Sequence, residues 1–155
     1  MAIYNFDGED IKGLPRLFGT IVMTNGVFDI LHRGHIEYLR KAKLLGDQLI
    51  VGINSDASVK KLCKGSERPY INQLDRAEIL SELKSVDYVV IFDQKTPVNL
   101  VKFLKPCIFV KGADYTIDQL PEAEVVISYG GAVKLIDIEV GYSTTSIVNN
   151  IKNKM

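Results

Sequence analysis

The chain has 155 residues and a mass of 17.3 kDa, which is the size of one typical domain. Apolar residues make up 46% and charged residues 25% of the sequence, so the composition excludes a disordered chain, a collagen-like chain and a small disulfide scaffold. Basic and acidic residues number 19 each, and the formal net charge is zero. Because a general nucleic-acid or acidic-membrane binder usually carries a basic excess, we expect neither partner.

The amino-terminal segment and the two cysteines bear on the cellular location of the protein. Residues 1–10 are acidic and lack the apolar core of a secretory signal. The longest apolar runs have about five residues, far below the roughly 20 that span a bilayer. Cys63 and Cys107 match no zinc or redox spacing, which favours two reduced thiols. We therefore expect a cytoplasmic protein.

Five short β-branched runs alternate with helical patterns along the chain. They lie at residues 21–23, 49–53, 88–92, 107–110 and 132–136. Nearly continuous apolar runs of this length are typical of strands buried on both faces of a parallel sheet. The sequence predicts one α/β domain over residues 1–155, with a Rossmann-like, open parallel sheet of about five strands flanked by helices. Residues 1–18 contain two glycines and a proline, and we expect them to be peripheral.

Capping residues mark the expected helix starts. Asp75 and Glu78 have the spacing of a capping box ahead of an apolar helical pattern. Thr96 precedes Pro97, which predicts an N-cap followed by a proline at the first helical position. The last eight residues are expected to finish a carboxy-terminal helix.

The segment TNGVFDILHRGH, from Thr24 to His35, joins the first predicted strand to the first long helix. In open α/β sheets, ligands bind beyond the carboxyl ends of strands and near helix amino termini. Gly26 and Gly34 are expected to let a bound group come close to the backbone. His32 and His35 face the same way if they lie on one helical turn. Together with the backbone N–H groups of a helix start, they predict an anion site that is best suited to phosphate.

Other interpretations of the two histidines are weaker. A single histidine is more often a structural residue, and a metal site usually needs a third ligand, for which no other histidine is present. The chain lacks both the phosphate-binding loop GxxxxGK[ST] and the dinucleotide fingerprint GxGxxG. The segment therefore favours a phosphate site of another kind.

These residues resemble the signature of the cytidylyltransferase-like nucleotidyltransferases, which carry a His-x-Gly-His motif. Further segments resemble the heptose 1-phosphate adenylyltransferase group of that family. They are NSD at 54–56, KG at 64–65, RP at 68–69, VKGADY at 110–115 and EVGYSTTSI at 139–147. The resemblance covers roughly residues 20–151. It implies transfer of AMP from ATP, with Mg²⁺, to D-glycero-β-D-manno-heptose 1-phosphate, giving ADP-heptose and pyrophosphate for lipopolysaccharide synthesis.

The resemblance also implies roles for individual residues. The catalytic set is His32, His35, Lys64 and Arg76. The nucleotide-binding set is Thr24, Asn25, Gly26, Phe28, Gly34, Lys111, Gly112, Asp114, Tyr142, Ser143, Thr144 and Thr145. The acceptor-binding set is Asn54, Asp56, Lys61 and Arg68, with Asp56 also as a ligand of Mg²⁺. Residues 60–76 have a local charge of +3, which favours a mobile loop that closes over phosphate groups.

The expected partners are therefore the small molecules ATP and a sugar 1-phosphate. The resemblance further implies a homo-oligomer, and the chain length suggests that the sugar kinase of the pathway is a separate chain. Two alternatives stay open at this point. One is the same chemistry with CTP and glycerol 3-phosphate or another polyol phosphate, and the other is a nucleotide-binding module without catalysis.

Overall fold

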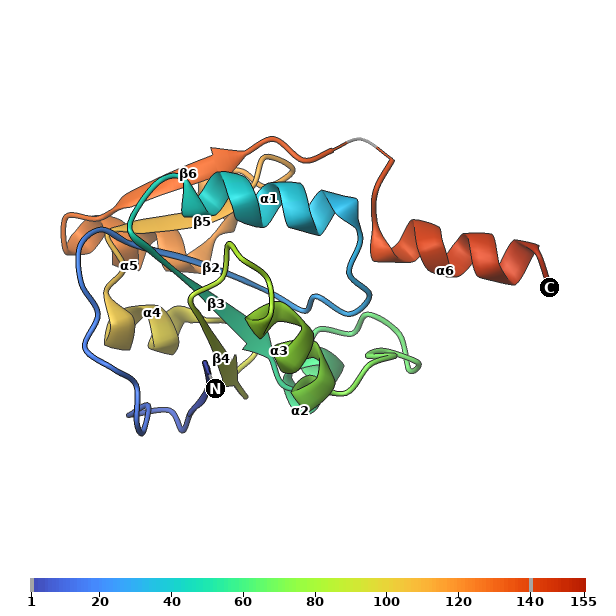
Figure 1. Ribbon diagram of the computed structural model, residues 1–155, viewed down its shortest axis with the longest axis horizontal. Coiled ribbons are helices and arrows are strands. Elements are labelled where there is room, and N and C mark those ends of the chain that lie inside the picture. The colour runs from blue at the N-terminus through green and yellow to red at the C-terminus, as the bar shows by residue number, and fades with distance from the viewer. Residues whose placement is uncertain (1, 140) are drawn as a thin grey trace.

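Apolar segments of four to seven residues form the strands of one parallel sheet in the computed structural model, which describes residues 2–139 and 141–155 (Figure 1). The strands are β1 Ile3–Phe6, β2 Ile21–Gly26, β3 Gln48–Asn54, β4 Tyr88–Phe92, β5 Ile108–Gly112 and β6 Ala132–Ile136. Their order across the sheet is β1-β4-β3-β2-β5-β6, and every neighbouring pair is parallel. The predicted α/β fold with an open parallel sheet is confirmed.

The amino-terminal segment is a correction to the prediction. Residues 1–18 were expected to be peripheral, but β1 adds a sixth strand beside β4, with Ile3 in register with Val89. Phe6 and Ile11 are buried against the same face of the sheet as α4. Part of the segment therefore belongs to the core, although its partner strand lies more than 80 residues away in the sequence.

Helices cover both faces of the sheet. They are α1 Arg33–Lys43, α2 Asp56–Lys61, α3 Gln73–Ser81, α4 Val98–Leu104, α5 Pro121–Ser128 and α6 Thr144–Asn153, with a 3₁₀ turn η1 at Ile117–Gln119. On one face, Leu39 of α1 and Leu80 of α3 pack on β3 and β4. On the other face, Leu100 of α4 and Val126 of α5 pack on β2, β4 and β5. No helix among these described residues is long and apolar enough to cross a membrane.

Two helix starts differ from the prediction. The start of α3 lies one turn earlier than the Asp75 capping box, because the Asn72 side chain accepts the Asp75 N–H at 2.9 Å. The N-cap position of α4 is Pro97 rather than Thr96, and it makes no side-chain cap bond. The earlier start of α3 matters for the site, since it places Arg76 in the buried second turn.

The direction in which successive strands are added across the sheet reverses at β2. From there the chain builds outward through β3 and β4, and then returns to place β5 on the other side of β2. Ligands of open α/β sheets bind outside the carboxyl ends of strands at such a reversal. Here the carboxyl ends of β2 and β5 lie side by side, next to the start of α1. The last helix, α6, extends from the body beyond the same edge of the sheet (Figure 1).

Candidate active site

The two histidines cap the start of α1 for each other. His32 is the N-cap residue, and its Nδ1 accepts the backbone N–H of His35 at 3.4 Å. The His35 Nδ1 accepts the backbone N–H of His32 at 3.3 Å. The rings stack with their centroids 3.8 Å apart. Because both Nδ1 atoms act as acceptors, the neutral rings carry their protons on Nε2, and each ring presents an N–H donor on its opposite side.

Burial keeps this pair neutral. It lowers the pKa of His35 to about 4, with repulsion from His32 as a second cause, and it also lowers the pKa of His32. The sequence analysis expected free backbone N–H groups here as the anion donors, but the N–H groups of His32 and His35 are used by the reciprocal cap. The cap does not use the backbone N–H groups of Arg33 and Gly34 in the same turn, so the turn offers an anion two neutral imidazole donors, and the predicted backbone donors are reduced to the N–H groups of these two residues.

The two glycines of the motif make room for side chains of the protein. A Cβ on Gly26 would lie 2.8 Å from the Phe28 ring, and a Cβ on Gly34 would lie 2.9 Å from both the His32 ring and Tyr142. Phe28 has a φ of 50° and packs 5.2 Å from the His35 ring. In this structure, each glycine leaves room for an aromatic side chain in the wall of the site, and the close approach of a ligand to the backbone stays a prediction.

A pocket of about 340 Å³ opens beside the histidines. Fifteen of the predicted site residues line it: Asn25, Gly26, Phe28, His32, Gly34, His35, Lys64, Arg68, Lys111, Gly112, Asp114, Tyr142, Ser143, Thr144 and Thr145. The sequence analysis did not assign to the site Val27, Asp29, Tyr38, Tyr115 and Ile138, which also line it. Tyr38 lies outside the quoted motifs, in the second turn of α1, whereas Tyr115 ends the VKGADY motif but was given no role. The binding role of every lining residue stays a prediction.

Lys111 joins the carboxyl ends of β5 and β2. Its Nζ donates to the backbone oxygen and the side-chain oxygen of Asn25, at 3.2 and 3.3 Å, and lies 4.9 Å from the centre of the Tyr115 ring. Burial lowers the pKa of Lys111, while the Glu122 and Asp114 carboxylates oppose that shift. The ammonium group is thus held at the point where β2 and β5 end.

The amino terminus of α6 is tied to the histidine turn. Ser143 is the N-cap and accepts the Ser146 N–H at 2.9 Å. The Thr144 hydroxyl donates to the backbone oxygen of Ile30 at 2.9 Å. The Thr145 hydroxyl accepts a hydrogen bond from Arg68 at 3.3 Å. These bonds connect the end of the chain to the first βα turn, so the pocket is built from both ends of the sequence.

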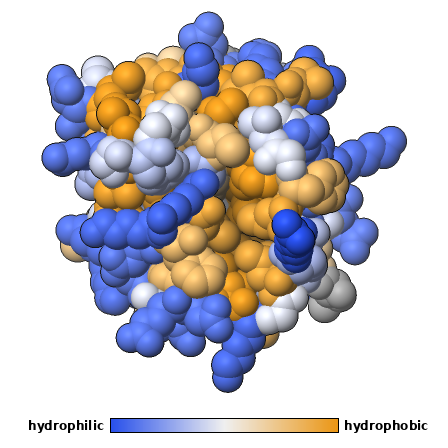
Figure 2. All heavy atoms as spheres, turned by 90° about the vertical axis from the view of Figure 1, so that its left-hand side faces the viewer, coloured by the Kyte–Doolittle hydropathy of each residue, from blue (hydrophilic) through white to orange (hydrophobic). Residues whose placement is uncertain are grey.

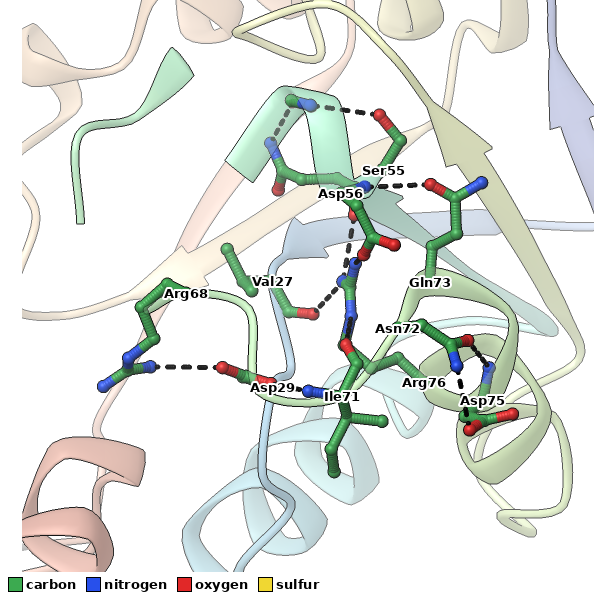
Figure 3. A network of polar contacts seen from close by, with 12 residues as sticks. Val27, Asp29, Ser55, Asp56, Arg68, Ile71, Asn72, Gln73, Asp75 and Arg76 are labelled. Carbon is green, nitrogen blue, oxygen red and sulfur yellow. Dashed lines mark hydrogen bonds and ion pairs between the residues drawn. The ribbon is translucent and has the colours of Figure 1, made fainter. Parts of the chain in front are cut away.

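Asp29 holds the basic loop against the pocket. This carboxylate is 3% exposed and accepts the backbone N–H groups of Tyr70 and Ile71 at 2.9–3.0 Å. Arg68 lies 3.6 Å from the same carboxylate (Figure 3). Its guanidinium also lies over the Tyr70 ring, 5.1 Å from the ring centre. The carboxy-terminal end of the loop that was predicted to move is therefore anchored to the histidine turn.

Arg76 lies behind the pocket wall. It is 1% exposed, and its guanidinium donates to the backbone oxygens of Ile71, Val27 and Asn54 at 2.7–2.9 Å and to Asp56 at 2.9 Å (Figure 3). This corrects the predicted contact with the nucleotide, because all of its nitrogens are occupied by the protein. It instead holds three segments together: the turn after β2, the end of β3 and the start of α3.

Four other predicted residues also lie outside the pocket. Thr24 is fully buried, and its hydroxyl bonds to Tyr38 and to the Val110 backbone oxygen. Asn54 donates to Ser58, and the Lys61 ammonium donates to the Asp93 backbone oxygen. The side chain of Asp56 pairs with Arg76. The predicted acceptor-binding set is thus reduced to Arg68, because the other three point into the protein or away from the pocket.

The residues present do not form a dedicated magnesium site. Across residues 2–139 and 141–155, no three His, Cys, Asp or Glu side chains come together as a ligand cluster. Asp56, the predicted ligand, is paired with Arg76, and the Asp29 oxygens accept backbone N–H groups.

Val140, which lies in the predicted 139–147 motif, is outside the described residues.

Comparisons with known proteins agree with this geometry. The family description "Cytidylyltransferase-like" matches residues 23–150. The bifunctional protein HldE of Campylobacter fetus is 58% identical over 144 residues, which cover 93% of this chain and 30% of that protein. HldE of Geobacter sulfurreducens is 53% identical over 131 residues, which cover 84% and 26%. The chain therefore spans less than a third of the length of these curated relatives.

A solved structure is also similar to this chain. The lipopolysaccharide core biosynthesis protein from Thermoplasma volcanium is 34% identical and superposes with a TM-score of 0.64, covering 79% of this chain and 98% of that one. The family match extends over most of the sequence and includes the histidine turn and the start of α6. The chain belongs to the cytidylyltransferase-like family of nucleotidyltransferases.

Proposed function

We propose that this chain transfers AMP from ATP to a sugar 1-phosphate, and specifically to D-glycero-β-D-manno-heptose 1-phosphate, releasing ADP-heptose and pyrophosphate. The observation that carries the proposal is the stacked pair of neutral histidines at the amino end of α1, inside a pocket that also contains Lys64, Arg68 and Lys111. The similarity to HldE and to a lipopolysaccharide core biosynthesis protein supports the heptose as acceptor.

The chemistry needs little from the protein beyond positioning and charge stabilisation. An oxygen of the acceptor phosphate attacks the α-phosphorus of ATP, and the bond from that phosphorus to the bridging oxygen breaks, so that pyrophosphate leaves with the electron pair. A phosphate monoester with a second pKa near 6 is mostly dianionic at pH 7, so the attack requires no general base. The protein must hold two mutually repelling anions in line, at about 3–3.5 Å.

The lining residues divide this work by their chemistry. The Nε2–H groups of His32 and His35 would donate to the oxygens of the triphosphate, where charge develops as pyrophosphate departs. Lys64 and Arg68 supply fixed positive charge beside them. The apolar and aromatic side chains of Phe28, Tyr115 and Ile138 offer surface for a flat base.

Magnesium enters the proposal with the nucleotide. Mg²⁺ keeps several waters and is usually bound through substrate phosphates and only one or two carboxylates. ATP as its Mg²⁺ complex is therefore the proposed substrate, and no ligand role is assigned to Asp56. The acceptor implies a sugar kinase that supplies it, which remains part of the proposal.

A pyrophosphate-release screen tests the proposal. It crosses ATP, CTP and GTP with heptose 1-phosphate and glycerol 3-phosphate in the presence of Mg²⁺. We expect turnover with ATP and heptose 1-phosphate and much weaker turnover with the other pairs. Turnover with CTP and glycerol 3-phosphate alone would replace the substrates while keeping the reaction. Tight binding of nucleotide without turnover in any pair would instead identify a nucleotide-binding module.

A further inference from the structure

A second hollow of about 360 Å³ adjoins the candidate active site, between the loop that follows α2 and one flank of α6. The residues that line it are Lys64, Gly65, Ser66, Glu67, Arg68, Tyr70, Thr145, Val148, Asn149 and Lys152. Its volume falls within the range of small-molecule sites, about 300–1,000 Å³. The residues assigned above to nucleotide transfer leave most of this hollow without a role.

The two hollows share one wall. Lys64, Arg68 and Thr145 line both of them. The Arg68 guanidinium donates to the Thr145 hydroxyl at 3.3 Å, and its side chain is 15% exposed, so it is held within the wall instead of extending into solvent. Any reaction that joins two phosphorylated substrates needs a place where both anions meet beside fixed positive charge. The shared wall has that composition.

The second hollow differs in chemistry from the first. Three basic side chains (Lys64, Arg68 and Lys152) and one acidic side chain, Glu67, line it, which gives a local charge of +2 for a dianionic phosphate. Apart from Gly65 and Val148, its lining residues carry side chains that donate or accept hydrogen bonds. The first pocket instead includes Phe28, Tyr38, Tyr115 and Ile138. Aromatic surface suits a flat base, whereas a dense set of donors and acceptors suits a group with many hydroxyls.

Polar side chains that line the second hollow already contact one another. The Tyr70 hydroxyl donates to the Glu67 carboxylate at 3.1 Å, and the Lys152 ammonium lies 3.5 Å from the same carboxylate. The loop and α6 therefore contact each other across the hollow as well as at Arg68 and Thr145. The Glu67 carboxylate and the Asn149 amide supply acceptors, and Asn149, Ser66 and Lys152 supply donors.

We propose that this second hollow, the acceptor hollow, binds the phosphorylated polyhydroxy acceptor, with its phosphate against Arg68 and Lys64 and its hydroxyl groups toward Asn149 and Glu67. The proposal rests on the proposed function, because it assigns the acceptor of that reaction to one flank of α6. It replaces the set Asn54, Asp56 and Lys61, which the structure places elsewhere.

Two adjacent asparagines of α6 provide a matched test. Asn149 lines the acceptor hollow, whereas Asn150 lines a separate hollow on the other flank of α6, which borders the active site at His32 and Tyr142. With heptose 1-phosphate as acceptor, N149A should raise the KM for the acceptor about fivefold, as expected for the loss of one hydrogen bond, and leave the KM for ATP unchanged. N150A should leave the KM for the acceptor unchanged, because Asn150 lies on the opposite flank from the acceptor hollow. The reverse pattern, or equal effects of both substitutions, would overturn the proposal.

A binding measurement separates this proposal from the reaction itself. Heptose 1-phosphate and glycerol 3-phosphate are added separately to the ¹⁵N-labelled chain in the absence of nucleotide, and the backbone amide signals are followed. We expect the signals of Ser66, Glu67 and Asn149 to shift for at least one of them, even if the turnover screen fails. Shifts confined to Arg33 and Asn150, or no shift with either probe at millimolar concentration, would contradict the acceptor hollow.

Discussion

The two ends of the parallel sheet carry different kinds of side chains. At the carboxyl ends of the strands lie the stacked histidines, Lys111 and the Arg68 loop, all within one pocket. At the amino ends, the side chains of Phe18 and Leu44 are 66% and 80% exposed and lie in the turns that lead into β2 and β3. Figure 2 views this side of the molecule, and apolar side chains gather at its centre with hydrophilic ones around them.

The difference follows from the direction of the helices. In a βαβ unit the helix begins at the carboxyl end of the strand before it, so the positive ends of α1 and its neighbours point to that edge. The amino edge receives helix carboxyl ends, such as that of α1 with Arg40, Lys41 and Lys43 in its last turn. Chemistry on anions is therefore confined to one edge, and exposure of a side chain at the other edge is no sign of a site. Substitutions at the two edges put this contrast to the test.

The largest expected effect is on the free energy of unfolding, from a substitution of Arg76, which is buried behind the pocket wall. R76M removes the guanidinium and leaves three backbone oxygens and the Asp56 carboxylate without their partner. We expect a loss of about 3–5 kcal/mol in the free energy of unfolding, measured by urea denaturation.

R68M is the matched control for that variant. The Arg68 side chain is 15% exposed, and its partner Asp29 keeps the N–H groups of Tyr70 and Ile71 as donors in the variant, so we expect a smaller loss of about 1–2 kcal/mol and a raised KM for the acceptor. Wild-type stability of R76M together with abolished turnover would mean that Arg76 contacts the nucleotide after all.

The next effect is on turnover. H35A and H32N should each lower kcat by about 10²–10³-fold, as when one preorganised donor to a developing charge is lost. Asparagine is a strong N-cap residue, so H32N keeps the start of α1 while it removes the imidazole. The circular dichroism spectra should match that of the wild type. Near-normal kcat in both variants would refute the role of the histidine pair.

The smallest effect is expected at the amino edge. L44S replaces a side chain that is 80% exposed and follows the last residue of α1. We expect kcat and both KM values to stay within about twofold of the wild type, and the free energy of unfolding within about 0.5 kcal/mol. A tenfold loss of turnover in L44S would show that the amino edge also takes part in function.

The fold could be predicted where local pattern decides it. The five apolar runs form β2 to β6. The runs of β2 to β5 are mostly buried, as their pattern predicts, whereas β6 is a partly exposed strand at the sheet edge. β1 could not be predicted in the same way, since its four residues sit at the sheet edge and pair with a strand more than 80 positions away. Its stability comes from a contact that the local sequence does not encode.

For the site, the sequence identified the motifs but not the direction of the side chains. Arg68 and Arg76 are equally basic and eight residues apart, yet one lines the pocket and the other is buried behind it. The start of α3 at Asn72 decides this, because it sets which side of the helix faces β3. Asp56 was predicted to be a metal ligand because the sequence shows its charge but not its partner, which is Arg76.

The histidine pair is the centre of this account, and nitrogen NMR of the two histidines tests it most directly. At pH 7 without nucleotide, both rings should be neutral with the proton on Nε2, and His35 should titrate at about 4. Mg²⁺ with ATP should raise both pKa values, because the phosphate charge favours the protonated rings. An Nδ1-protonated His35 that titrates near 6.5 and does not respond to ATP would contradict the account.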